Sequence, residues 1–186
     1  KAYNWAVFGT AKRMGKRGKH IVTTAIEHHA ILNCMKDLES QGFSVTYLQP
    51  DSLGRISVDV LKAALRKDTI LVSVMMVNNE TGAVMPIADM VKAVRRASPL
   101  ALFHTDAVQG FLKVPFRAKA LGADMISVSA HKIHAAKGIG CVDAVVAVAG
   151  NLYIQVPHKG GHADLFGLFV QRDHDHAVGP LAVLAF

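Results

Sequence analysis

The residues best suited to chemistry each follow an apolar run, and the first of them is a lysine. Lys132 ends the segment 129–132 (SAHK), directly after a run of the kind that forms a buried strand. A lysine in that place would be partly desolvated, which favours the neutral amine that forms an imine with an aldehyde cofactor. The alternative is an ordinary surface lysine in a loop, and position alone favours that alternative.

Asp106 ends the apolar segment 102–106 (LFHTD). A carboxylate there is costly unless a partner compensates its charge. Pyridoxal phosphate supplies such a partner, because a carboxylate beside its pyridinium nitrogen keeps the ring protonated and makes it an electron sink. An aspartate that caps the next turn is an equally common explanation. Gln109 could reach the same ligand if that turn is helical.

Two further polar residues follow other apolar runs. His28 begins a predicted helix, where an imidazole can stack on a flat cofactor and exchange protons near neutral pH. A helix cap or a surface residue is the alternative for a lone histidine. Asn79, in the segment 77–82 (VNNETG), has a short amide suited to a hydrogen bond with a ring substituent. An asparagine ahead of Gly82 is also typical of a turn.

Around these residues, the sequence alternates between β-branched runs and segments with helical periodicity. Helices are predicted at 28–40, after Ser57 and from Pro86. Strands are predicted at 20–24, 43–48, 69–77, 100–104, 124–129 and 140–149. This order predicts an α/β fold with a mainly parallel sheet and helices on both faces. Ligands of such sheets bind beyond the carboxyl ends of the strands, where the polar residues above lie.

Composition places the chain among globular proteins. Its 186 residues are 51% hydrophobic and 19% charged, enough for one domain with a buried core. No apolar run is long enough to span a membrane, and no signal peptide is visible. The first residue is Lys1 and not a methionine, so we expect a piece of a longer protein. Cys34 and Cys141 form no disulfide framework, and a reducing, cytoplasmic setting is expected.

Two other patterns are interpreted as surface features. The net charge of +7 partly reflects a basic cluster without aromatic interleaving or a recognition motif, so no nucleic-acid partner is predicted. Its members are Lys12, Arg13, Lys16, Arg17 and Lys19. No metal site is predicted either, because the spacing of the C-terminal histidines is weak evidence. These are His158, His162, His174 and His176.

In their order and spacing, the candidate residues resemble those of the cysteine desulfurases, in the class V aminotransferase branch of fold-type-I pyridoxal-phosphate enzymes. The matching segments are 20–32 (HIVTTAIEHHAIL), 42–56, 69–87 (TILVSVMMVNNETGAVMPI), 102–116 (LFHTDAVQGFLKVPF) and 121–140 (LGADMISVSAHKIHAAKGIG). The resemblance covers residues 17–140. It implies a partial pyridoxal-phosphate-binding large-domain core at 1–150, followed by a weakly matching segment of the same domain at 151–186.

The resemblance implies which residues carry the reaction. Lys132 would hold the cofactor through an imine and later move the substrate proton. Asp106 would pair with the pyridinium nitrogen, and Gln109 would hydrogen-bond the ring oxygen.

The resemblance also implies the remaining contacts with the cofactor. His28 would stack on the ring and assist proton transfer. Asn79 would contact the ring hydroxyl or the substrate carboxylate, while Ser129 and His131 would bind the phosphate.

The activity implied is the conversion of L-cysteine to L-alanine, with sulfur passed to an enzyme cysteine. That cysteine is expected beyond Phe186, since neither Cys34 nor Cys141 matches it, and the 186 residues alone are expected to be inactive. A homodimer and a sulfur-acceptor or iron–sulfur scaffold partner are implied as well. Two alternatives stay open: a selenocysteine lyase or other class V enzyme, and a non-catalytic fragment that serves as a binding or scaffold piece.

Overall fold

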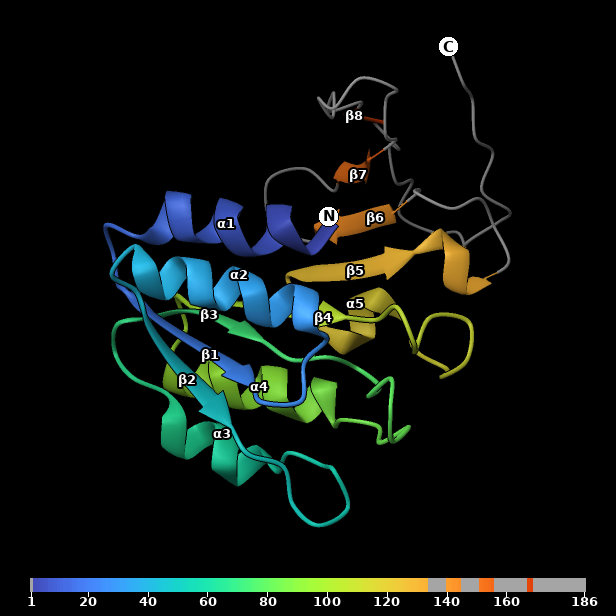
Figure 1. Cartoon of the computed structure of the whole chain (residues 1–186), viewed down its shortest axis with the longest axis horizontal. Coiled ribbons are helices and arrows are strands. Elements are labelled where there is room, and N and C mark those ends of the chain that lie inside the picture. Colours follow the sequence, from blue (N-terminus) through green and yellow to red (C-terminus); the bar gives the residue numbers. More distant parts are fainter. Residues whose placement is uncertain (1, 134–139, 145–150, 156–166, 169–186) are drawn as a thin grey trace.

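The computed structural model describes residues 2–133, 140–144, 151–155 and 167–168. Helices cover both faces of a sheet (Figure 1). The helices are α1 (Ala2–Met14), α2 (His29–Ser40), α3 (Val58–Ala64), α4 (Ile87–Ala97), α5 (Ala118–Leu121) and the short 3-10 helix η1 (Ala130–Ile133). The strands are β1 (His20–Thr24), β2 (Ser44–Leu48), β3 (Thr69–Ser73), β4 (Leu102–Asp106), β5 (Met125–Ser129), β6 (Gly140–Ala144), β7 (Asn151–Gln155) and β8 (Gly167–Leu168).

The described strands form one sheet in the order β2-β1-β3-β4-β5-β6-β7-β8. The pairs from β2 to β5 are all parallel, and the pairs from β5 to β8 are antiparallel. The predicted mainly parallel α/β sheet is therefore confirmed. Its five parallel strands bring their carboxyl ends to one edge.

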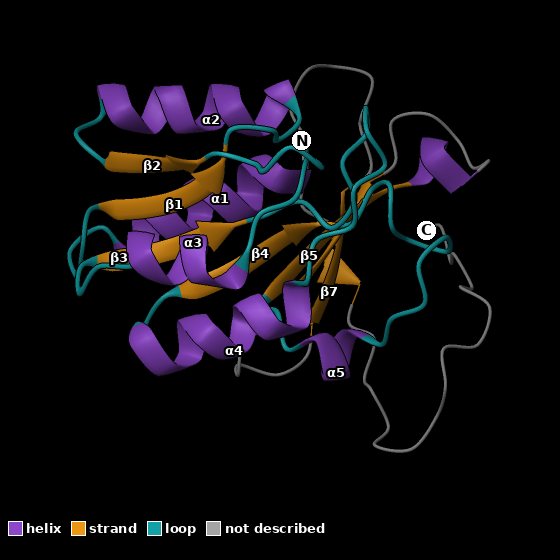
Figure 2. Cartoon of the chain, turned by 90° about the horizontal axis from the view of Figure 1, so that it is seen from below, coloured by secondary structure: helices purple, strands orange, loops and turns teal. Residues whose placement is uncertain are grey.

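The sheet separates two apolar cores (Figure 2). One core lies under α1 and α2 and includes Val7, Ile31 and Met35. The other lies under α3 and α4 and includes Met90 and Phe103. Side chains alternate along a strand, so His104 and Asp106 point to the face opposite to that of Phe103. His104 and Asp106 therefore lie on the face that α1 and α2 cover.

Local sequence explains where helices α3 and α4 begin and which face of α2 is buried. Ser57 accepts a hydrogen bond from the Val60 amide and caps α3, as predicted. α2 buries one stripe of side chains at helical spacing, which are Ile31, Cys34, Met35 and Leu38. α4 begins at Ile87 with Pro86 as its N-terminal flanking residue, one position later than predicted.

Strands β3 and β4 differ from their predicted bounds by two residues or more, and β2 and β5 each begin one residue later than predicted. Residues 145–149 of the last predicted strand lie outside the described residues. β3 ends at Ser73, although the Val74 amide still donates to the His104 carbonyl at 3.1 Å. β4 spans Leu102–Asp106 and not 100–104, since Leu100 is exposed in the preceding turn. Helices α1 and α5 were not predicted. α5 is a single turn, too short for a periodic pattern.

Most of the C-terminal segment 151–186, including all four of its histidines, lies outside the described residues. Their interpretation as surface residues therefore stays a prediction. Within the described part of the chain, no helix has the length and apolar character that crossing a membrane requires. Nor does that part contain a group of three or more His, Cys, Asp or Glu side chains that could hold a metal ion.

Candidate active site

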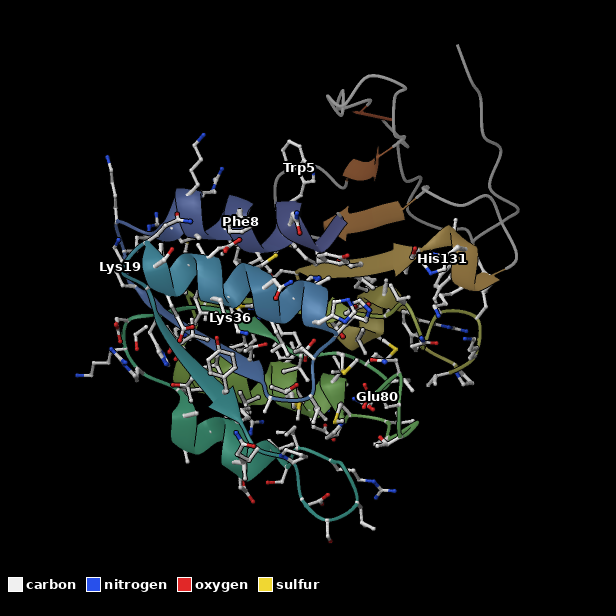
Figure 3. The ribbon with its side chains drawn as sticks, viewed as in Figure 1. Trp5, Phe8, Lys19, Lys36, Glu80 and His131 are labelled. Carbon is white, nitrogen blue, oxygen red and sulfur yellow. The ribbon has the colours of Figure 1, made fainter. Side chains whose placement is uncertain are left out.

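The candidate residues lie at the edge where the parallel strands end. Glu27 and His28 follow β1, Asn79 follows β3, Asp106 is the last residue of β4, and Lys132 follows β5 in η1. Figure 3 shows Glu80 and His131 on the side toward which the strand arrows point, and Lys19 on the opposite side. The topology thus gathers residues that are more than one hundred positions apart along the chain.

Asp106 is a buried carboxylate, 6% exposed. Its Oδ1 accepts a hydrogen bond from the Val108 amide at 2.9 Å, which fixes the side chain at the end of β4. Burial raises the pKa of Asp106, because the charged form loses hydration. The negative charge of Asp106 reaches Tyr3 of α1, whose pKa is raised first by burial and then by Asp106. A cationic ligand group would stabilise this carboxylate.

Gln109 lies half-buried in the turn that follows Asp106. The turn contains helix-like hydrogen bonds, such as the one from the Phe111 amide to the Ala107 carbonyl at 2.7 Å. It is nevertheless not a continuous helix, and Gln109 Oε1 accepts from Lys113 Nζ at 3.3 Å. Gln109 thus lies in the turn just after the carboxyl end of β4, three residues beyond Asp106.

His28 is the N-cap of α2, and its Nδ1 accepts a hydrogen bond from the Ala30 amide at 3.2 Å. A neutral imidazole whose Nδ1 accepts must carry its proton on Nε2. Burial lowers the pKa of His28, and the charges of His29 and Lys132 lower it further. The charge of Lys132 therefore reaches His28 across the carboxyl edge of the sheet, with β3 and β4 between β1 and β5.

Ser129, His131 and Lys132 form the β5 end of the site. Ser129 Oγ and His131 Nδ1 lie 2.7 Å apart and share a hydrogen bond. His131 and Lys132 are both exposed. The partial desolvation expected for Lys132 is wrong for the described structure, because η1 is one surface turn that buries none of its residues.

Asn79 is exposed, whereas the preceding Asn78 is buried. Asn78 Oδ1 accepts from the amides of Glu80 and Thr81 at 3.0 and 2.8 Å, as expected of a turn-forming asparagine. The turn interpretation therefore describes Asn78, and Asn79 is held at the surface of the same turn.

Sequence reasoning gave Glu27 no role, although it stands beside His28. Glu27 is 5% exposed, and its Oε1 accepts from Thr24 Oγ1 at 2.8 Å and from the Met75 amide at 2.7 Å. Its buried Oε2 has no hydrogen-bond partner among the described residues. Burial raises the pKa of Glu27 to about 8, so its carboxyl group is largely protonated at neutral pH. The one sequence signal for a role of Glu27 was its position as a charged residue shortly after the buried strand β1.

The family model described as aminotransferase class-V matches residues 1–163. The chain belongs to the class-V aminotransferase family. It is 50% identical over 139 residues to the cysteine desulfurase IscS of Anaeromyxobacter dehalogenans (strain 2CP-C), which covers 75% of this chain and 34% of that relative. It is 48% identical over 139 residues to the putative cysteine desulfurase IscS 1 of Bacillus subtilis (strain 168), which covers 75% of this chain and 36% of that relative.

Solved structures agree with the family. A NifS-like protein has a TM-score of 0.76 and 39% identity, covering 79% of this chain and 40% of that one. SspA in complex with cysteine has a TM-score of 0.72 and 40% identity, covering 80% of this chain and 42% of that one. The fold is therefore that of the large domain of fold-type-I pyridoxal-phosphate enzymes, as the sequence predicted. The chain spans about a third of the length of the curated relatives it matches.

Proposed function

We propose that this class-V chain is part of a pyridoxal-phosphate-dependent cysteine desulfurase, which converts L-cysteine to L-alanine and passes the sulfur to a cysteine thiol. The observation that carries the proposal is the buried carboxylate of Asp106 at the same sheet edge as Lys132 and His28. The names of the matched relatives, cysteine desulfurases, support the substrate and the reaction.

The residues present fit pyridoxal phosphate. Asp106 is a desolvated carboxylate whose raised pKa reflects a charge without adequate compensation, and a pyridinium nitrogen would provide that compensation. When bound, the cofactor supplies an electron-withdrawing ring that stabilises negative charge on the substrate carbon. Lys132 would supply the amine that binds the aldehyde carbon, on an exposed turn that a cofactor could reach.

The other candidate residues would orient the ring. Gln109 and Asn79 would bind its oxygen substituents, one from the β4 end and one from the β3 end. Ser129 and His131 would bind the phosphate, and their existing 2.7 Å hydrogen bond places both groups on one turn.

His28 would hold and move a proton. Its lowered pKa keeps the imidazole neutral at physiological pH, and its hydrogen bond with the Ala30 amide leaves the proton on Nε2. A neutral ring stacks on a cationic heterocycle without repulsion, and its Nε2–H can donate a hydrogen bond. To move a proton, the ring would first accept one at Nδ1 and release the Ala30 amide.

The test is alanine formation from L-cysteine by the intact protein that carries this chain, loaded with pyridoxal phosphate. Lys132→Ala should lower the rate by at least roughly 10³-fold, because it removes the group that binds the cofactor and moves the proton. The matched control is Lys36→Ala, which removes an exposed lysine of α2 and should leave the rate unchanged (Figure 3).

Retention of the rate in Lys132→Ala would contradict the proposal. Faster alanine formation from selenocysteine than from cysteine would favour a selenocysteine lyase. Absence of any cofactor-dependent reaction in the intact protein would favour a non-catalytic binding or scaffold role.

From the family resemblance we also propose that the protein acts in the cytoplasm as a homodimer. A sulfur acceptor or an iron–sulfur scaffold protein would receive the sulfur. Gel filtration with light scattering would test this: a homodimer should have twice the mass of one chain of the intact protein.

A further inference from the structure

The order of the parallel strands places a topological switch point, where a ligand crevice is expected in an open α/β sheet, between β1 and β3. The chain leaves β1 toward α2, on one face of the sheet, and leaves β3 toward α4, on the other face (Figure 2). Ligands of open α/β sheets bind in such a crevice, outside the carboxyl ends of the strands. In this protein two buried side chains bridge the crevice, Glu27 and Asn78, and neither has a role in the reaction proposed above.

Glu27 ties the segment after β1 to the segment after β3. Its Oε1 accepts one hydrogen bond from Thr24, the last residue of β1, and one from the amide of Met75, two residues after β3. The Met75 amide is buried and would lose its partner without this carboxyl group, which is costly. Glu27 therefore fixes the spacing of the two segments.

Asn78 makes the reciprocal connection. It follows β3, and its Nδ2 donates to the carbonyl of Ile26, which follows β1, at 2.9 Å. The two bridges thus run in opposite directions between the same two segments. Each bridging residue directly precedes a candidate site residue, Glu27 before His28 and Asn78 before Asn79.

We propose that Glu27 and Asn78 form a clamp across the β1/β3 crevice that positions His28 and Asn79 for the reaction, an inference that rests on the proposed function. Glu27 and Asn78 are positioning residues, since they act through their neighbours.

The protonated state of Glu27 suits this task. With the pKa raised to about 8 by burial, and also by the charge of Asp106, Glu27 can accept hydrogen bonds without adding negative charge beside Asp106. A glutamine has the same shape and the same accepting oxygen. Glu27→Gln should therefore preserve the clamp, whereas Glu27→Ala should break it.

The experiment measures the pKa of His28 by NMR in the protein without cofactor, and then kcat and KM for cysteine in the loaded protein. In Glu27→Ala and in Asn78→Ala, the pKa of His28 should rise toward the ordinary value of about 6.5, because the released segment exposes the ring. In the same two variants kcat should fall by roughly 10- to 100-fold with a smaller change in KM, since misplacement affects the reacting geometry. Glu27→Gln should match the wild type in both measurements.

Glu39→Ala is the matched control. Glu39 also accepts a hydrogen bond from a hydroxyl group, that of Tyr47 at 2.9 Å, but it is exposed and lies near the other end of α2 from His28. It should change neither the pKa of His28 nor kcat. If Glu27→Ala does not fold, an unchanged pKa of His28 in Asn78→Ala, or a loss of kcat in Glu27→Gln, would overturn the clamp.

An unchanged pKa of His28 in both alanine variants would overturn the clamp, whatever the activity. Equal losses in Glu27→Gln and Glu27→Ala would overturn it as well. A raised pKa of His28 in both alanine variants, with unchanged alanine formation, would confirm the positioning of His28 and contradict its part in the proposed function.

Discussion

Buried histidines inside the sheet and buried carboxyl groups at its carboxyl edge differ in how fully they are hydrogen-bonded. In the middle, His104 has Nδ1 2.9 Å from Ser73 Oγ and Nε2 2.7 Å from Ser127 Oγ. At the amino ends of β1 and β3, His20 is bridged in the same manner by Thr69 and Thr46, at 2.7 and 2.9 Å. Both rings are buried with both nitrogens occupied, so they connect three strands and have nothing left to offer a ligand.

At the carboxyl edge, buried polar atoms are not all paired in hydrogen bonds. Glu27 Oε2 is buried without a partner among the described residues, and His28 uses Nδ1 to cap α2. Asp106 is held by a backbone amide while its pKa is raised by burial. Burial of a polar side chain therefore does not by itself mark a site. Incomplete pairing at the end of a strand does, because that is where a ligand can complete it.

Removing a saturated histidine from the middle should have the largest effect on stability. His104→Ala leaves two buried hydroxyls unpaired and opens a cavity, so we expect a loss of about 3–5 kcal/mol in the free energy of unfolding. Urea denaturation measures it. A loss below about 1 kcal/mol would show that the row Ser73–His104–Ser127 does not stabilise the sheet.

Glu27→Gln should change how stability depends on pH. The pKa of Glu27 is about 8 in the folded protein and 4.5 in the reference state, so the folded state binds more protons between these values. Stability should therefore fall as pH rises through this window, by on the order of a few kcal/mol, and the glutamine variant should not show that fall.

Urea denaturation at a series of pH values, with wild type and variant compared at each pH, provides the measurement. The lowered pKa of His104, about 4, makes stability rise with pH below about 6.5 in both proteins, and the comparison cancels it. Parallel curves would mean that Glu27 is ionised in the folded state at neutral pH.

The smallest effect is expected in the turn after β4. Leu112 is 76% exposed and has φ 61°, a left-handed conformation that is costly for a branched side chain. Leu112→Gly should raise the free energy of unfolding by about 0.5–1 kcal/mol, because the relief of strain exceeds the entropy lost. The control is Leu100→Gly, at an exposed leucine with negative φ, which should lower it. Lower stability in Leu112→Gly would show that the loop requires this leucine.

Local signals in the sequence were sufficient for much of the fold and for predicting which polar residues share the carboxyl edge of the sheet. Strand β1 and the Ser57 cap follow from neighbouring residues and were confirmed. The clustering at strand ends follows from topology, since parallel strands end at one edge. The family was recognised because several motifs occur in the family's order, and the class-V match confirms it.

Tertiary contacts decided what the sequence could not. The role of Glu27 depends on the Met75 amide, 48 positions away, and therefore on the alignment of β1 with β3. Sequence alone cannot tell which of the adjacent residues Asn78 and Asn79 forms the turn, because that depends on which side chain faces Ile26. The exposure of Lys132 depends on what packs over η1.

The most direct test of the central claim locates the amine that binds the cofactor. The protein is incubated with pyridoxal phosphate, reduced with borohydride, digested and analysed by mass spectrometry of the peptides. We expect a single pyridoxyl label on Lys132, and a lower yield in Asp106→Asn because the ring would lose its charged partner. A label absent from Lys132, or spread evenly over the exposed lysines, would mean that Lys132 is not the cofactor-binding lysine.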